Sequence, residues 1–261
     1  MEANLPAIIF GKEQIWKWYR MFDWTLYTKD PSDKETGKKL QAFLASVQAF
    51  YPQSRMDFLR DYFKASRVMD IGAGEHTPSV YKEDRWEHGV IAKNASYAVG
   101  IEINRELCDH YNKKGFNFKC VDATSATDLG ERFDLVFMGD VIEHVNNPVA
   151  LLEFGKRHLT NGKGRILVST PNPFCFSYIS ARVRKGYRPF FIANFEHISW
   201  ITPTNANELA RRSGLKLTKI YFPDSSLRGF KKILKILTEK MFHSFDMAEL
   251  AHKEYIYEFT L

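Results

Sequence analysis

Four residues with acid–base or metal-binding side chains define the part of the chain most able to do chemistry. Asp140, Glu143 and His144 are spaced i, i+3, i+4, which places them on one side of a helical turn. His197 follows the next apolar run and could approach the same place. Two carboxylates and two imidazoles suit a divalent ion such as Mg²⁺ or Mn²⁺. The same residues also allow His144 or His197 to act alone as a metal-free general base, or Glu143 and His144 to have only a structural role in shaping the loop.

A glycine-containing loop precedes this turn in the sequence. Residues 68–74 read Val-Met-Asp-Ile-Gly-Ala-Gly, an apolar run that ends in a Gly-x-Gly turn. Glycine allows close approach of a nucleotide-like cofactor and a positive φ. A dinucleotide site would need a third glycine where Thr77 stands, and Asp70 would repel a pyrophosphate. The loop, with Asp70, Gly72, Ala73 and Gly74, therefore favours a cofactor that has a cationic amino-acid end.

Apolar runs alternating with helical patterns predict a parallel α/β sheet that positions these residues. The expected strands are 67–71, 97–102, 116–121, 133–138, 165–169, 215–222 and 254–261. Glu102 ends the second of them, where a carboxylate can accept both hydroxyls of a ribose. In an open α/β sheet the carboxyl ends of the strands form the ligand site, so the loop, Glu102 and the Asp140–His144 turn should lie together.

The motifs at these strand ends resemble those of class I S-adenosylmethionine-dependent methyltransferases, in particular the ubiquinone-biosynthesis-type group (methyltransferase type 11/23-like). The resemblance covers residues 67–222. It is carried by residues 68–74, by Glu143-His144-Val145 with its Asn-Asn-Pro turn, by Thr170-Pro171-Asn172 and by His197-x-x-Trp200. It implies a Rossmann-like sheet of seven mostly parallel strands and S-adenosylmethionine as the cofactor.

The resemblance also implies further site residues. Asp122 would reach the adenine amino group, with a backbone amide beside it at Ala123. We also assign Ile103, Gly139 and Asp140 to the cofactor site. The cluster at 140–144 with His197 is similar to the metal site of small-RNA 3′-terminal 2′-O-methyltransferases, in which a Glu-x-x-Glu-His stretch and a later His hold the ion. Here Asp140 replaces the first Glu.

The segments outside the core are expected to be additions to it. Residues 1–66, rich in Trp and Tyr, predict a helical cap with helices at 40–50 and 56–63, which either packs on the sheet or lines the acceptor pocket. The core spans 67–224, a basic amphipathic helix is expected within 225–253, and 254–261 form the last strand. That helix suggests packing on the domain, a homodimer contact or peripheral membrane docking.

Composition and charge set wider limits. Hydrophobic residues make up 44% of the 261-residue chain, and no run approaches the roughly 20 apolar residues of a membrane span. The start of the chain lacks a secretory pattern, and three scattered cysteines fit reduced thiols, so we expect a cytoplasmic protein. The net charge of +6 is compatible with an anionic partner.

These observations together predict methylation, most simply on oxygen, of a small molecule or of a glycan- or lipid-linked precursor. The alternatives are RNA 2′-O-methylation, which the basic charge and possible metal site allow, and a non-catalytic S-adenosylmethionine-binding partner protein. A Rossmann dehydrogenase is a third alternative, which Asp70 and Thr77 disfavour.

Overall fold

The computed structural model describes residues 21–75, 79, 84–184, 196–223 and 248–261. The predicted aromatic cluster before Phe22, Thr77 in the loop after the glycines, and most of the predicted helix within 225–253 lie outside these residues.

One mixed sheet organises the described part of the chain. Its eight strands there have the order β1-β7-β8-β6-β5-β2-β3-β4. They are β1 (Gln48–Phe50), β2 (Arg67–Ile71), β3 (Tyr97–Glu102), β4 (Phe118–Cys120), β5 (Leu135–Met138), β6 (Arg165–Pro171), β7 (Lys216–Tyr221) and β8 (Glu254–Thr260). Only β8 runs antiparallel to its described neighbours, β6 and β7. The seven predicted strands are therefore present, with one further strand at the edge.

The additional strand corrects the prediction of a helix over 40–50. Helix α2 (Lys34–Ser46) ends at Ser46, Val47 is extended, and β1 pairs in parallel with β7. Tertiary context overrides the helical periodicity, because backbone hydrogen bonds along the open edge of β7 favour extended backbone at 48–50.

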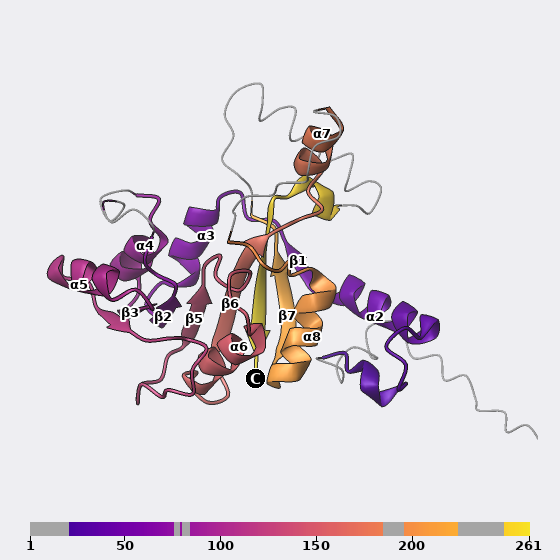
Figure 1. Cartoon of the computed structure of the whole chain (residues 1–261), viewed down its shortest axis with the longest axis horizontal. Coiled ribbons are helices and arrows are strands. Elements are labelled where there is room, and N and C mark those ends of the chain that lie inside the picture. The colour runs from indigo at the N-terminus through magenta and orange to yellow at the C-terminus, as the bar shows by residue number, and fades with distance from the viewer. Residues whose placement is uncertain (1–20, 76–78, 80–83, 185–195, 224–247) are drawn as a thin grey trace, which may run out of the picture.

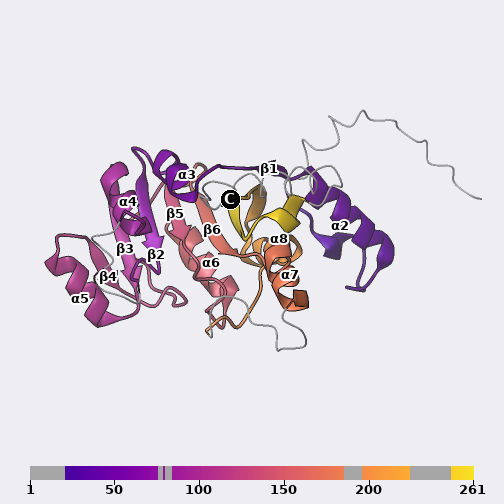
Figure 2. The ribbon, with the colours of Figure 1, turned by 90° about the horizontal axis from the view of Figure 1, so that it is seen from above.

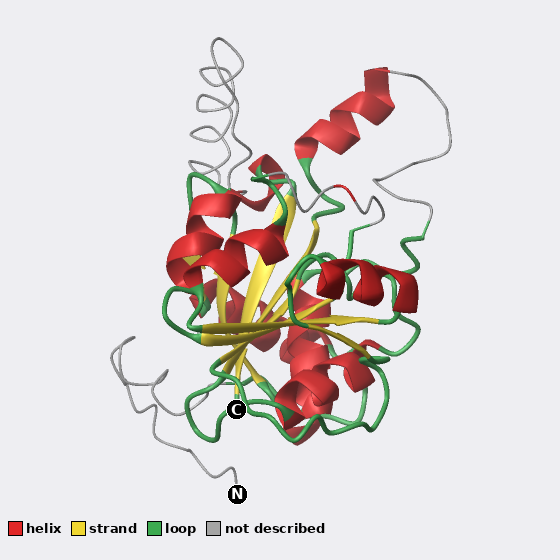
Figure 3. Cartoon of the chain, turned by 90° about the vertical axis from the view of Figure 1, so that its left-hand side faces the viewer, coloured by secondary structure: helices red, strands yellow, loops and turns green. Residues whose placement is uncertain are grey.

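Helices cover both faces of the sheet, as Figure 3 shows. The main ones are α3 (Arg55–Tyr62), α4 (Glu87–Asn94), α5 (Arg105–Lys113), α6 (Pro148–Arg157), α7 (Phe176–Arg184) and α8 (Pro203–Ser213), with short 3₁₀ turns η1 (Trp24–Leu26) and η3 (Ala248–Ala251). Helices α3 and α4 contact one another on one side, whereas α6 and α8 pack together on the other (Figure 2). Helix α2 lies beside α8, and α7 extends beyond the sheet after β6 (Figure 1).

The central strands are buried on both faces, as expected for parallel strands between helical layers. Met69 and Ile71 of β2 pack in the cluster that includes residues of α6 and α8. Val68 points to the opposite face, in the cluster that contains Leu59 of α3 and Ile91 of α4. This alternation fixes which side of the sheet each residue at the strand ends faces.

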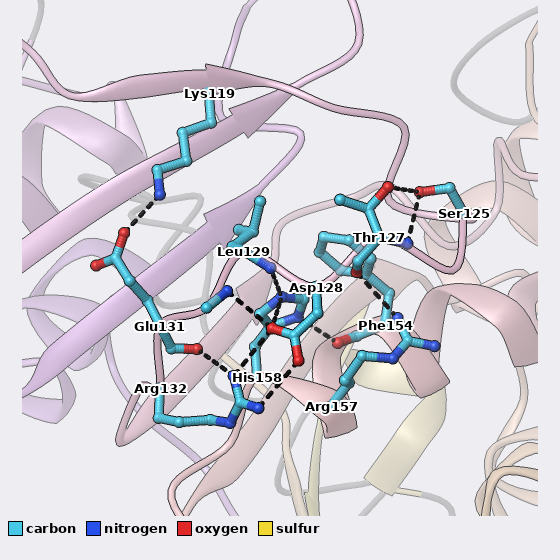
Figure 4. A network of polar contacts seen from close by, with 11 residues as sticks. Lys119, Ser125, Thr127, Asp128, Leu129, Glu131, Arg132, Phe154, Arg157 and His158 are labelled. Carbon is cyan, nitrogen blue, oxygen red and sulfur yellow. Dashed lines mark hydrogen bonds and ion pairs between the residues drawn. The ribbon is translucent and has the colours of Figure 1, made fainter.

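The loop that follows β4 is anchored to α6 by one buried histidine (Figure 4). His158 Nε2 accepts from the backbone N–H of Leu129 at 2.9 Å, and Nδ1 donates to the carbonyl of Phe154 at 2.8 Å. Asp128, whose carboxylate pairs with Arg132, lies 3.6 Å from Nε2. The histidine thus sets the position of the loop that begins at Asp122.

The described residues bear on two of the general predictions. Cys108, Cys120 and Cys175 are all free thiols, as expected. Among the helices of the described residues, none has the length and apolar character needed to cross a membrane.

Candidate functional site

The loop after β2 has a glycine with positive φ at Gly72 and a second glycine that lies close to Glu102 at Gly74. Gly72 has φ +72°, and a Cβ there would lie 2.2 Å from Cγ2 of Val141. A Cβ on Gly74 would lie 2.6 Å from Oε2 of Glu102. The loop is therefore packed between the turn after β5, which carries Val141, and the end of β3, which carries Glu102. Because its glycines have no side chains, the loop backbone lies close to both of these residues.

Glu102 lies where the sequence predicts, at the carboxyl end of β3 beside the glycine loop. Its Oε2 accepts from the N–H of Gly74 at 3.2 Å, and its Oε1 accepts from the N–H of Asn104 at 2.9 Å. These bonds fix the carboxylate while leaving lone pairs on both oxygens for hydroxyl donors. Ile103, 70% exposed, presents an apolar side chain directly next to it.

Asp70 lies beneath the loop and has a partner within the protein. Its carboxylate is 2.9 Å from Nδ1 of His88 on α4, and both side chains are buried. Burial raises the pKa of Asp70, and the contact with His88 opposes that shift. Asp70 therefore joins β2 to α4 below the Gly-x-Gly turn.

Asp122 lies exposed after β4, next to Ala123. Its carboxylate accepts from the N–H of Thr124 at 2.8 Å and from its hydroxyl at 2.7 Å, and these bonds lower the pKa of Asp122. The carboxylate stays ionised and retains acceptor capacity toward solvent.

Glu143, His144 and His197 come together at the carboxyl edge of the sheet. Their candidate ligand atoms all lie within 4.8 Å of one another. The two imidazole rings meet edge-to-face with centroids 4.7 Å apart, and Nε2 of His197 is 3.9 Å from Oε1 of Glu143. The backbone N–H of Ile198 donates to the carbonyl of Glu143 at 3.0 Å, which holds the two segments together. Trp200 packs against His197, with centroids 5.5 Å apart.

Burial controls the charge of this cluster. Glu143 is fully buried, and neither carboxylate oxygen makes a well-aligned hydrogen bond within the described part of the chain, although the Thr170 hydroxyl and its own backbone weakly stabilise the charged form. Burial raises the pKa of Glu143 to about 8, and the negative charge of Asp140 adds to the shift. Burial, followed by the neighbouring His144, lowers the pKa of His197. Near neutral pH the cluster therefore contains a neutral imidazole that can accept a proton or bind a metal.

Asp140 does not join this cluster. Its Oδ1 accepts from the hydroxyl of Ser169 at 2.8 Å, and its Oδ2 lies 3.4 Å from the guanidinium of Arg55. Three of the four predicted metal ligands thus converge, and Asp140 lies to one side of them.

Arg55 is a site residue that the sequence reasoning missed. Its guanidinium, on α3, pairs with Glu87 and Glu254 and donates to Ser169 at 2.9 Å. Burial raises the pKa of Glu87 to about 7, against the opposing effect of Arg55. No local pattern marks Arg55, because its partners lie on four other segments.

The sequence matches the model of a family described as a methyltransferase domain over residues 40–220. The chain belongs to the class I S-adenosylmethionine-dependent methyltransferases. This confirms the family that the strand-end motifs predicted and supports it over a dehydrogenase.

Distant relatives agree with this assignment. The ubiquinone biosynthesis O-methyltransferase of Coxiella burnetii is 23% identical over 165 residues, which are 60% of this chain and 66% of the relative. The enzyme of the same name from Dinoroseobacter shibae is 30% identical over 159 residues, 59% of this chain and 61% of the relative. The match thus spans less than two thirds of these relatives.

A solved structure with the same fold is similar to this one. The crystal structure of an S-adenosylmethionine-dependent methyltransferase from Archaeoglobus fulgidus aligns with a TM-score of 0.50 at 19% identity, covering 78% of this chain and 91% of that one. This likeness concerns the fold.

Proposed function

We propose that this methyltransferase transfers a methyl group to an oxygen of a small molecule or of a glycan- or lipid-linked precursor. The observation that carries the proposal is the convergence of Glu143, His144 and His197 at the strand ends, next to the glycine loop. Oxygen acceptors need deprotonation, and these are groups that can remove or stabilise a proton.

The residues around the loop fit S-adenosylmethionine. The Glu102 carboxylate suits the ribose hydroxyls, the backbone at Gly72 and Gly74 approaches closely because no Cβ is present, and Asp122 with Ala123 would receive the adenine. When bound, the cofactor supplies an electrophilic methyl group on a sulfonium, a good leaving group. The protein's part is then to orient the acceptor and to exclude water.

His197 and His144 are the candidates for the base. In its neutral form either imidazole can take the acceptor's hydroxyl proton, so that the oxygen gains the methyl group and the histidine becomes imidazolium. Glu143, held largely protonated by burial below about pH 8, would keep its own proton and stabilise that charge by accepting from the imidazolium N–H through its carbonyl oxygen.

A divalent ion is the second arrangement that the geometry favours. A buried carboxylate with no well-aligned hydrogen bond to the described residues, beside two imidazoles, is a donor set that would suit Mg²⁺ or Mn²⁺, with His ligands better suited to Mn²⁺. The ion would lower the pKa of an acceptor hydroxyl bound to it.

The acceptor is inferred to have an apolar part. Phe174, Phe176 and Ile179 after β6 are between 39% and 48% exposed, and Ile198, bonded to Glu143 through its backbone, is 58% exposed. The names of the relatives place their substrates in ubiquinone biosynthesis, which agrees with an apolar acceptor.

Calorimetric titration with S-adenosylhomocysteine, after chelation and again with Mn²⁺, tests the cofactor and metal parts. An acceptor panel of phenols, prenylated phenols, phosphosugars and RNA, read by S-adenosylhomocysteine formation, tests the rest. We expect Glu143→Ala and His197→Ala to lose at least 100-fold in turnover while Glu153→Ala, an exposed glutamate on α6, keeps it. Full turnover in both site variants would refute the proposal.

A further inference from the structure

Asp140 has an unusual backbone for a residue next to the reactive cluster. Its φ is +49°, in the left-handed region, and among the described non-glycine residues only Ala65 shares a positive φ. Asp tolerates this conformation better than most residues, but the conformation is still less favourable than the right-handed region. Asp140 leads directly into the turn that carries Glu143 and His144, so its φ sets the direction of that turn.

The hydroxyl of Ser169 holds Asp140 from both its backbone and its side chain. Ser169 Oγ accepts from the N–H of Asp140 at 3.0 Å and donates to its Oδ1 at 2.8 Å. The backbone pairing of β5 with β6 ends one step earlier, at Met138 and Val168. The serine hydroxyl therefore continues the contact between the two segments where the sheet hydrogen bonds stop.

The hydroxyl is itself fixed and fully used. Ser169 is completely buried, and Arg55 Nη2 donates to its Oγ at 2.9 Å. One donor and two acceptor sites are all that a hydroxyl has. Its rotation is thus restricted, and it can hold one arrangement of Asp140.

We propose that Ser169 is a positioning residue for the methyl transfer, which holds Asp140 in the left-handed conformation and thereby directs Glu143 and His144 toward His197. The functional part of this statement rests on the proposed role of that cluster. Ser169 itself does not touch the reacting atoms. Its contribution acts through the backbone at Asp140.

The test compares Ser169→Ala with Ser169→Thr, which retains the hydroxyl, and with Ser213→Ala as a matched control. Ser213 is also a buried serine with a bonded hydroxyl, but it lies on α8. Amide hydrogen exchange and the ring ¹H–¹⁵N NMR signals of His144 and His197 are recorded on the full chain. These measurements need no acceptor.

In Ser169→Ala we expect exchange at the Asp140 amide to rise about tenfold, equal to about 1.4 kcal/mol, with displaced ring signals for His144 and His197. Ser169→Thr should restore both, and Ser213→Ala should change neither. Asp140→Gly in the Ser169→Ala chain should reduce the effect, because glycine adopts a positive φ without strain.

An unchanged Asp140 amide and unchanged ring signals in Ser169→Ala would overturn the proposal, as would an equal rise of exchange across β2. If Ser169→Ala does not fold, Asp140→Ala must show the same signature with Ser169 intact, and its absence overturns the proposal. Titration of the wild-type chain with S-adenosylhomocysteine reports separately on the proposed function. A chain that held the turn but bound no S-adenosylhomocysteine would refute that function alone.

Discussion

Replacing Glu143 with glutamine should stabilise the metal-free protein at high pH while removing its activity. Glu143 is fully buried and makes no well-aligned hydrogen bond to the described residues, and burial outweighs the weak stabilisation from Thr170, so its ionised form is costly in the fold. Between its ordinary value of 4.5 and the folded pKa of about 8, the native state keeps a proton that the unfolded chain has lost. Stability therefore falls as pH rises through this interval and stays low above it.

The size of the effect follows from the same values. The interval from 4.5 to about 8, at about 1.4 kcal/mol per pH unit, gives an upper limit of about 5 kcal/mol. Water entry and side-chain adjustment reduce the cost of burying an ion, so we expect about 2–3 kcal/mol. That corresponds to roughly 5–10 °C in Tm for a chain of this size.

Urea unfolding in EDTA at pH 5 and pH 9 measures this effect. The free energy of unfolding of Glu143→Gln minus that of wild type should be larger at pH 9 than at pH 5. The cost of burying the amide is the same at both pH values, so it cancels when the two differences are compared. Glu153→Gln, an exposed change on α6, should show no such gain. If the difference between Glu143→Gln and wild type were the same at both pH values, Glu143 would not carry a raised pKa and the electrostatic reasoning would be wrong.

Three further predictions concern the cofactor loop and the loop after β4. Glu102→Gln should weaken S-adenosylhomocysteine binding at least tenfold by calorimetry, since a charge-assisted acceptor is lost; unchanged affinity would argue against ribose binding. Gly72→Ala should destabilise the fold by about 2–4 kcal/mol in urea, through its positive φ and its approach to Val141, and Val141→Ala should recover part of this. Burial lowers the pKa of His158, so this residue contributes a loss of stability as pH falls from 7 to 5, because the unfolded chain binds its proton more readily. The wild type should therefore lose stability relative to His158→Gln over this range, and an equal difference between the two proteins at pH 7 and pH 5 would exclude the lowered pKa of His158.

The sheet could be predicted from the sequence because its central strands carry strong local signals. Residues 67–71 and 97–102 are apolar runs bounded by polar turns, and β2 and β3 have those bounds. Helix α8 begins after Thr202 with Pro203 in its first turn and ends before Gly214 at φ +64°, as capping preferences predict. Local sequence patterns are enough to predict an element when its bounds are determined by burial on both faces, as for the central strands, or by capping residues, as for α8.

The edge strand and the charge network could not be predicted, because both depend on residues far apart in the chain. β1 has no strand signal of its own and forms against β7, about 170 residues later. Arg55 meets Glu254, 199 residues away, where α3 lies beside the start of β8. The spacing of Asp140, Glu143 and His144 predicts that all three side chains converge, but the structure brings Glu143 and His144 to His197 and has the Asp140 carboxylate bonded to Ser169 instead.

The segment before β2 is joined to the candidate site by charge as well as by packing. Around Arg55 lie three carboxylates, those of Glu87, Asp140 and Glu254, which come from α4, the turn after β5 and the start of β8. Burial, and to a smaller extent the charge of Asp140, raises the pKa of Glu87 to about 7 even though Arg55 opposes the shift. Without Arg55 these groups would repel one another at the same strand ends, where the cofactor loop and the Glu143 turn must lie close together. We therefore expect the docking of α3 to help assemble the candidate site, because Arg55 offsets the charges of these carboxylates at the strand ends.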